Sequence, residues 1–190
     1  MMTLPTVAFV DPEALGKWLA RHHASSTGVW LKLAKKGSGI ASITYAEVIE
    51  VALAWGWIDG QKKPFDDDWW LQKLTPRGPR SIWSKINRDK ALALIKAGTM
   101  KPSGLAEVER AKRDGRWEAA YDSQSRATVP DDLAAALSAN PRAKAFFATL
   151  DSGNRYAVLF RVHSAKKAST RAERIARFVE MLARHEKLHP

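Results

Sequence analysis

Two kinds of hydrophobic spacing follow one another along the first part of the chain, and the first is helical. Leu15, Trp18 and Leu19 recur three and four positions apart, which places them on one face of a helix. Asp11 and Pro12 stand just before them, and Asp is a frequent N-cap while Pro suits the first helical turn. The sequence therefore predicts a helix that begins after Asp11.

The second spacing is the alternation of apolar and polar residues that is typical of strands. It is clearest over residues 29–33. Residues 57–63 and 69–74 have the composition of two further strands, and segment 64–68, with its Pro and three Asp residues, has that of a turn. We expect these two segments to pair as a hairpin.

Further helices are predicted between and after these strands. Thr44 and Glu47 form a T-x-x-E capping box in front of an apolar run. Asn87 is a candidate cap for a helix that Gly98 closes, and a further helix is expected over residues 103–113.

The pattern changes near residues 122–129, where Ser and Thr replace the apolar positions. Everything that follows has helical spacing. The pair Asn140 and Pro141 is typical of a helix start, and Thr170 with Glu173 forms a second capping box.

The predicted fold class is α+β. An N-terminal domain, residues 1–122, is expected to combine a small antiparallel sheet with helices, and residues 129–190 are expected to form a helical C-terminal unit of about four helices.

Composition narrows the classes of protein that fit. No apolar run approaches the length of a membrane span, and Met1–Val10 lacks the features of a signal peptide. There is no cysteine, so disulfides and thiolate metal sites are excluded. These features favour a cytoplasmic protein.

The formal net charge is +11, and the excess of positive charge lies entirely beyond residue 60. Such a charge attracts nucleic acid or small anions, or only keeps the surface solvated.

Several segments resemble the YdeI/OmpD-associated family, also called bacteriocin-protection proteins. The resemblance is carried by W-G-W-I-D-G-Q from Trp55, T-P-R from Thr75, S-I-W-S-K-I-N from Ser81, M-K-P-S-G from Met100, A-K-R-D-G-R-W from Ala111, R-Y at Arg155, A-K at Ala165 and T-R-A-E-R-I from Thr170.

This resemblance implies a link to bacteriocin tolerance and to an outer-membrane porin, and it transfers no catalytic residue and no cofactor. It favours a non-enzymatic binding protein connected with envelope or antimicrobial stress. A porin partner lies outside the cytoplasm, so any effect on the envelope would be indirect or would precede export of the partner. The protein partner itself is not identified.

Tryptophans gather in the middle of the chain, where five of the eight fall within 29 positions. Charged residues stand among them. One interpretation is a cleft for a small anionic or amphipathic ligand, in which Arg77 grips a carboxylate or phosphate. The other is that the indole rings fill a core with the charges at its rim. The candidate ligand-binding residues are Trp57, Asp59, Arg77, Trp83 and Arg116.

Nucleic acid is the alternative partner, because basic residues interleaved with aromatic ones suit phosphate contacts and base stacking. No recognised nucleic-acid-binding motif is present. The residues expected to contribute in this case lie near the end of the chain: Lys166, Lys167, Arg171, Arg174 and Arg177.

Enzyme motifs are few. No phosphate-binding glycine loop and no nucleophile elbow occurs. His185 to His189 reads H-E-x-x-H, but a zinc site of that type needs a rigid helix and a third ligand, normally downstream, where only Pro190 follows. We therefore expect no metal and no cofactor. An enzyme that acts on a small anionic substrate without a recognisable motif stays open as a third interpretation.

Overall fold

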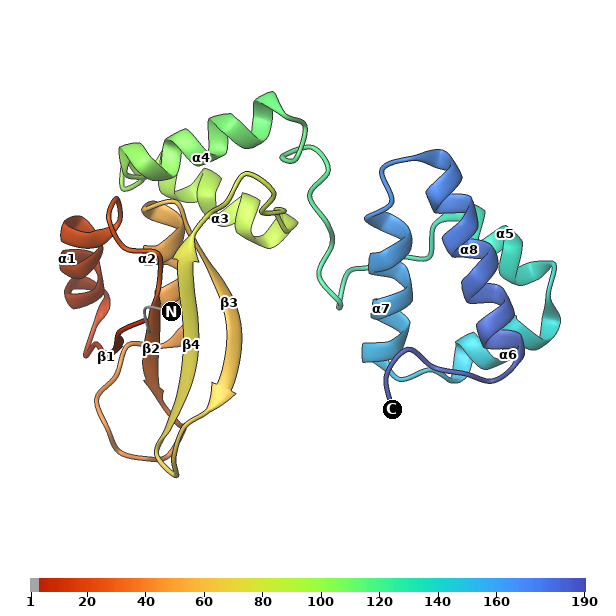
Figure 1. Ribbon diagram of the computed structural model, residues 1–190, viewed down its shortest axis with the longest axis horizontal. Coiled ribbons are helices and arrows are strands. Elements are labelled where there is room, and N and C mark those ends of the chain that lie inside the picture. The colour runs from red at the N-terminus through yellow and green to blue at the C-terminus, as the bar shows by residue number, and fades with distance from the viewer. Residues whose placement is uncertain (1–3) are drawn as a thin grey trace. The chain divides into compact units, whose positions relative to one another are not determined.

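A computed structural model describes residues 4–190. The prediction that Met1–Val10 is not a signal peptide falls partly outside this range, because residues 1–3 are not described. The described residues form four strands and eight helices and divide into two compact units, one ending at Ala120 and the other spanning Tyr121–Pro190 (Figure 1). We call them the N-terminal and the C-terminal unit. No helix among residues 4–190 has both the length and the apolar character required to cross a bilayer.

The N-terminal unit contains all four strands. Its elements follow in the order β1 (Thr6–Ala8), α1 (Pro12–His22), β2 (Val29–Ala34), α2 (Tyr45–Ala54), β3 (Trp57–Pro64), β4 (Trp69–Pro76), α3 (Lys85–Lys96) and α4 (Pro102–Arg113).

The strands form one sheet in the order β1-β2-β4-β3. The predicted hairpin is confirmed, because β3 pairs with β4 in antiparallel fashion, and β4 also pairs with β2 in antiparallel fashion. The short strand β1, which the sequence pattern did not predict, pairs with β2 in parallel, so the sheet is mixed. The α+β class is confirmed.

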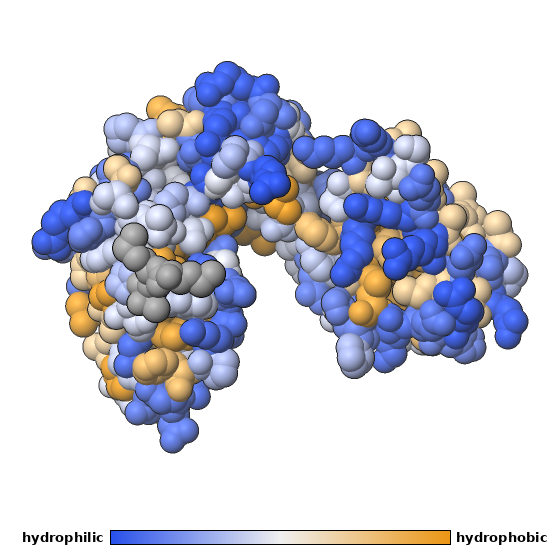
Figure 2. All heavy atoms as spheres, in the orientation of Figure 1, coloured by the Kyte–Doolittle hydropathy of each residue, from blue (hydrophilic) through white to orange (hydrophobic). Residues whose placement is uncertain are grey.

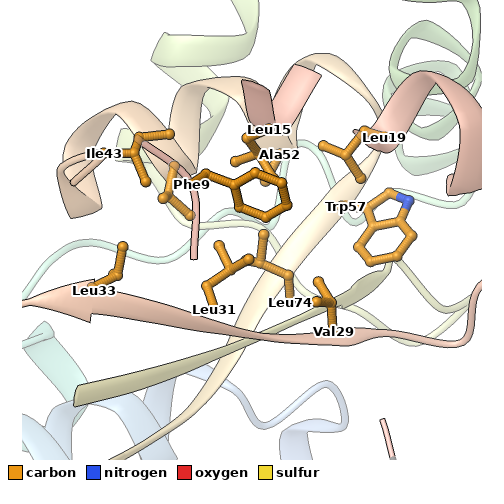
Figure 3. Close-up of a cluster of buried hydrophobic side chains, with 11 residues drawn as sticks. Phe9, Leu15, Leu19, Val29, Leu31, Leu33, Ile43, Ala52, Trp57 and Leu74 are labelled. Atoms are coloured by element: carbon orange, nitrogen blue, oxygen red, sulfur yellow. The ribbon is translucent and has the colours of Figure 1, made fainter. Parts of the chain in front are cut away.

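One face of this sheet packs against α1 and α2. Leu31 and Leu33 of β2 project from one side of the strand into the cluster that also holds Leu15 and Leu19 of α1 (Figure 3). Trp57 of β3 belongs to the same cluster and is only 1% exposed. A second hydrophobic cluster joins α2, α3 and α4. Helix α2 therefore contributes side chains to both clusters of the N-terminal unit.

The C-terminal unit is entirely helical, as predicted, with α5 (Asp131–Ser138), α6 (Pro141–Thr149), α7 (Ser152–His163) and α8 (Ala168–Ala183). Its core takes at least one buried side chain from each helix, for example Leu133 of α5, Phe147 of α6, Val162 of α7 and Phe178 of α8.

Helix starts follow the sequence in most places. The side chain of Asp11 caps α1, the capping box of Thr44 and Glu47 is formed, and Asn140 caps α6. Two starts were predicted at the wrong residue. Ser84, not Asn87, caps α3, because the backbone at Ser84 is extended and its hydroxyl accepts the amide of Asn87. Helix α8 begins at Ala168, so Thr170 and Glu173 lie within its first turns instead of capping it.

Candidate functional site

The five candidate ligand residues of the N-terminal unit do not all lie in one site. Trp57 lies in the core beside Trp18, with the ring centroids 5.9 Å apart and the planes at 88°. Asp59, two positions further along β3, is half-buried and accepts a hydrogen bond of 2.7 Å from the hydroxyl of Tyr45. Both side chains therefore hold α1 or α2 against the sheet.

Arg77, Trp83 and Arg116 do come together. The guanidinium carbon of Arg77 lies 3.8 Å from the centroid of the Trp83 ring, and Nη1 of Arg77 donates to the carbonyl oxygen of Ile82. Trp83 also meets Trp117 edge to face, at 4.9 Å between centroids. Arg77 and Trp83 are 4% and 2% exposed, so this stack is an interior feature of the unit.

Arg116 is fixed on both sides. Its guanidinium group makes a two-pronged contact with Asp114, at 2.8 Å from Nε and 2.7 Å from Nη2, and Nη1 donates to the carbonyl oxygen of Ser81 at 2.6 Å. These hydrogen bonds lower the pKa of the Asp114 carboxyl group. Arg116 thereby ties the segment before α3 to the segment after α4.

Glu107 adds a carboxylate to the same region. It pairs with Arg110, whose Nη2 also donates to the carbonyl oxygen of Arg77 at 3.1 Å. Burial raises the pKa of Glu107 above its ordinary value, although the positive charges of Arg110, Arg116 and Arg77 act in the opposite direction. The region is therefore a network of guanidinium groups, carboxylates and backbone carbonyls, and most of its charge is used internally.

Two of the motif segments contact each other. Gly56 and Gly104 lie where α4 crosses the end of α2, and the hydroxyl of Ser103 donates to the carbonyl oxygen of Trp55 at 2.9 Å. Gly56 has a φ of 74°, in the region that favours glycine. W-G-W and K-P-S-G are thus two sides of one close helix contact, which accounts for them structurally. Figure 2 shows hydrophilic residues over the C-terminal part of α4, whose last turn carries Arg110, Lys112 and Arg113.

The basic residues proposed for nucleic acid lie just before α8 and along its first ten residues. Arg171 and Arg174 turn back to the end of α7: Nη1 of Arg171 donates to the carbonyl oxygen of Val162 at 2.9 Å, and Nη1 of Arg174 donates to that of Arg161 at 2.6 Å. They satisfy carbonyl groups that a helix end leaves open. The side chains that remain exposed are those of Lys166, Lys167 and Arg177.

A cavity of about 130 Å³ opens in the C-terminal unit, between the segment that precedes α5 and helix α7. Tyr121, Tyr156 and Phe160 form an aromatic wall. The rings of Tyr121 and Phe160 meet edge to face at 5.1 Å, and the centroid of Tyr156 lies 5.9 Å from that of Phe160. The rest of the lining is Asp122, Ala127, Thr128, Pro130, Leu159, His163 and Arg171.

The polar groups of this cavity are positioned by the fold. The hydroxyl of Tyr156 donates to the carbonyl oxygen of Asp122 at 3.0 Å, and burial raises the pKa of this tyrosine, so its hydroxyl stays neutral. Arg171 reaches Asp132 with two hydrogen bonds, at 2.5 Å from Nε and 2.8 Å from Nη2. Flat aromatic walls with fixed donors are suited to holding a small molecule.

Sequence reasoning did not find this cavity. Of its residues only Tyr156 and Arg171 stood in segments that the family resemblance highlighted. Tyr156 was assigned to no partner, and Arg171 was a candidate for nucleic acid only. The available signal is weak, because Tyr121 lies at the end of the predicted N-terminal domain, whereas Tyr156 and Phe160 lie in a predicted helix of the C-terminal unit.

The H-E-x-x-H segment is not a helix. Helix α8 ends at Ala183, and His185 has a φ of 59° and stacks on Phe146. The backbone of His189 exchanges two hydrogen bonds with the side chain of Asn154. Within residues 4–190 no group of three or more His, Asp or Glu side chains is placed to hold a metal ion.

Comparison with known families divides the chain in the same two parts. Residues 7–107 match the family described as "Domain of unknown function (DUF8412)". Residues 126–185 match "Bacteriocin-protection, YdeI or OmpD-Associated". The resemblance seen in the sequence is therefore confirmed for its C-terminal segments, while W-G-W-I-D-G-Q falls within the other match. A search of curated proteins and a search of solved structures gave no significant match.

Proposed function

Because the chain belongs to the DUF8412 family and carries a YdeI or OmpD-associated domain, we propose that it is a non-enzymatic binding protein that takes a small amphipathic ligand in its C-terminal unit. The connection with envelope or antimicrobial stress, including bacteriocins, is part of this proposal and rests on the description of the matched domain. The observation that supports ligand binding is the cavity lined by the aromatic rings of Tyr121, Tyr156 and Phe160.

The size of the cavity limits the ligand. A dry protein cavity of about 150 Å³ accommodates benzene, so about 130 Å³ suits a single ring or a short branched chain. The faces and edges of Tyr121 and Phe160 favour stacking of a flat apolar part. Thr128 and His163 also line the cavity and offer hydrogen bonds to a polar or anionic substituent.

This cavity supports a ligand better than the tryptophan-rich region of the N-terminal unit does. Arg77, Trp83 and Arg116 are buried. Arg77 stacks on Trp83 and donates to a carbonyl oxygen, and Arg116 donates to Asp114 and to another carbonyl oxygen. A ligand that reached Arg116 would have to replace its hydrogen bonds to the Asp114 carboxylate and the one to a backbone oxygen, which are costly to lose at a buried guanidinium group. We therefore place the proposed ligand in the cavity of the C-terminal unit.

The test uses benzoate and phenol as probes with the full chain. Saturation-transfer NMR is expected to show contact of both probes with the protein, at millimolar concentrations. Phe160→Ala removes one aromatic wall and is expected to weaken binding at least fivefold, because aromatic contacts of this kind contribute about 1 kcal/mol. The matched control is Phe146→Ala, which removes a phenylalanine of the same unit that stacks on His185, away from the cavity.

Two results would overturn the proposal. One is that neither probe contacts the protein. The other is that Phe146→Ala weakens binding as much as Phe160→Ala, since the probes would then bind outside the cavity. Far-UV circular dichroism of both variants establishes that the helices of the C-terminal unit are retained.

A cytoplasmic location is also part of the proposal, and the cysteine-free sequence is compatible with it. Fractionation of cells that produce the chain with a C-terminal tag checks this, with recovery in the periplasmic or membrane fraction as the contrary result.

Deletion of the gene and exposure to a cationic bacteriocin tests the stress connection. Restored tolerance with the wild-type chain but not with Phe160→Ala would link the stress connection to the cavity.

A further inference from the structure

The sheet of the N-terminal unit has a second face. Side chains alternate along β2, so Trp30 and Lys32 project away from the side on which Leu31 and its neighbours are buried. The register places Lys73 opposite Trp30 and Trp69 opposite Ala34, and directly opposed residues share a face. Trp30 and Trp69 are half-buried and belong to none of the hydrophobic clusters of the described residues.

Lysine side chains lie over the aromatic rings of this second face. Nζ of Lys63 lies 4.2 Å from the centroid of the Trp30 ring, and Lys73 lies 5.9 Å from the same ring. Nζ of Lys32 lies 4.6 Å from the ring of Phe65 and 4.7 Å from that of Trp69. We call this set the lysine–aromatic face: Trp30, Lys32, Lys63, Phe65, Trp69 and Lys73.

The charge of this face has one sign. Strands β2 and β4 contain no acidic residue, and the one acidic residue of β3, Asp59, is paired with the buried Leu74 on the core side. The β3–β4 turn between Phe65 and Trp69 carries Asp66, Asp67 and Asp68, which are all exposed. Oδ1 of Asp66 accepts the amide groups of Asp68 and Trp69. The carboxylates next to the face are therefore confined to the turn, and an anionic partner that lies along the strands would meet three lysines.

We propose that the lysine–aromatic face binds single-stranded nucleic acid. The combination of a cationic surface with aromatic rings that present a side to solvent is what unpaired bases require: the rings stack on bases and the lysines contact phosphates. Phe65 is 50% exposed, and Trp30 and Trp69 lie four positions apart along paired strands, about 13 Å. This span accommodates a few nucleotides. A duplex hides the faces of its bases and cannot use the rings.

The lysines also explain how the face stays soluble when it is empty. Each ammonium group covers a ring that would otherwise be an exposed apolar surface. At an exposed site this attraction is weaker than the stacking of a base on an aromatic ring. A base can therefore displace the ammonium group, which then moves to the neighbouring phosphate. This proposal concerns the N-terminal unit and is independent of the cavity in the C-terminal unit.

The test is fluorescence anisotropy with labelled 20-mers of deoxythymidine and of uridine, and with a DNA duplex of equal length, titrated with the full chain at 50 and 200 mM salt. We expect the single strands to bind at least tenfold more tightly than the duplex. Trp69→Leu is expected to weaken single-strand binding about tenfold. The double variant Lys32→Gln and Lys63→Gln is expected to reduce the slope of log Kd against log salt by about 1.4.

The matched control is Lys166→Gln with Lys167→Gln, which removes the same charge from exposed positions of the C-terminal unit. It is expected to change single-strand affinity less than threefold. Phe65→Ala, at an exposed turn residue, provides a variant that leaves the sheet intact and is expected to weaken binding at least threefold. Equal affinity for single strands and duplex would overturn the proposal. An effect of the control as large as that of Lys32→Gln with Lys63→Gln would also overturn it, as would binding to phosphatidylglycerol vesicles without binding to either single strand.

Discussion

Gly104 in the first turn of α4 lies directly against the carbonyl group of Ala54 at the end of α2, so close that a Cβ at position 104 would overlap the carbonyl oxygen. A backbone atom cannot move aside as a flexible side chain can. The contact is reinforced from Lys101, whose amide donates to the same carbonyl oxygen at 3.0 Å. This crossing of α2 and α4 is what the glycines of the two motifs make possible.

Gly104→Ala is therefore expected to destabilise the N-terminal unit by about 1–3 kcal/mol, through overpacking. Denaturation followed by tryptophan fluorescence measures this unit specifically, because all eight tryptophans precede residue 121. Gly16→Ala is the matched control. Gly16 also lies within a helix, but nothing would stand within 4 Å of its Cβ. That variant is expected to be more stable by about 0.5–1 kcal/mol, and destabilisation of both variants alike would contradict the packing argument.

The stack of Arg77 on Trp83 gives a second prediction. Arg77→Lys keeps the charge but loses the flat guanidinium group, which the ring contact and the bond to Ile82 both use. We expect a loss of about 1–3 kcal/mol in unfolding free energy. Arg113→Lys, at an exposed position of α4, is expected to change stability by less than about 0.5 kcal/mol. Equal stability of Arg77→Lys and the wild type would show that the planar group is not required.

These contacts show where the sequence was informative. The caps at Asp11 and Thr44 depend on residues three positions away, so a local pattern was enough to find them. The start of α8 was misplaced because its first turns are fixed from a distance, by the bonds of Arg171 and Arg174 to the end of α7. Strand β1 has three residues and exists through its pairing with β2, more than 20 positions later.

The candidate sites show the same difference between features that nearby residues determine and contacts between residues far apart in the sequence. Arg77 and Arg116 were singled out as charges within aromatic motifs, and the structure does place both beside Ser81, Ile82 and Trp83. The cavity of the C-terminal unit brings Tyr121 next to Phe160, which is 39 positions away. No periodicity or motif encodes such a contact, so only the fold could reveal it.

The ion pair of Asp132 with Arg171 predicts a pH dependence. Hydrogen bonds from Arg171 lower the pKa of Asp132 in the folded protein, so folding favours the ionised carboxylate. Its stabilising effect is complete above the ordinary Asp pKa of about 3.9 and is lost as the pH falls through the lower folded value. We therefore expect Asp132→Asn to have a lower Tm than the wild type at pH 7, with unfolding followed at 222 nm. This difference should shrink below about pH 4. A difference that stays constant from pH 7 to pH 3 would exclude this pair as its source.

Asn154 connects the end of the chain to α7 and allows the two units to be tested separately. Its side chain is 3% exposed; its Oδ1 accepts the amide of His189 at 2.9 Å, and its Nδ2 donates to Asp151. Asn154→Ala leaves these partners without their bonds, which is expected to cost about 1–3 kcal/mol.

If the units unfold independently, this loss will move the helical transition of the C-terminal unit at 222 nm and leave the tryptophan fluorescence transition of the N-terminal unit in place. Gly104→Ala is expected to do the reverse, so the two variants form a reciprocal pair. An equal shift of both signals in Asn154→Ala would mean that the chain unfolds as one cooperative unit, because free energy lost around His189 could reach the tryptophans only through coupling between the units.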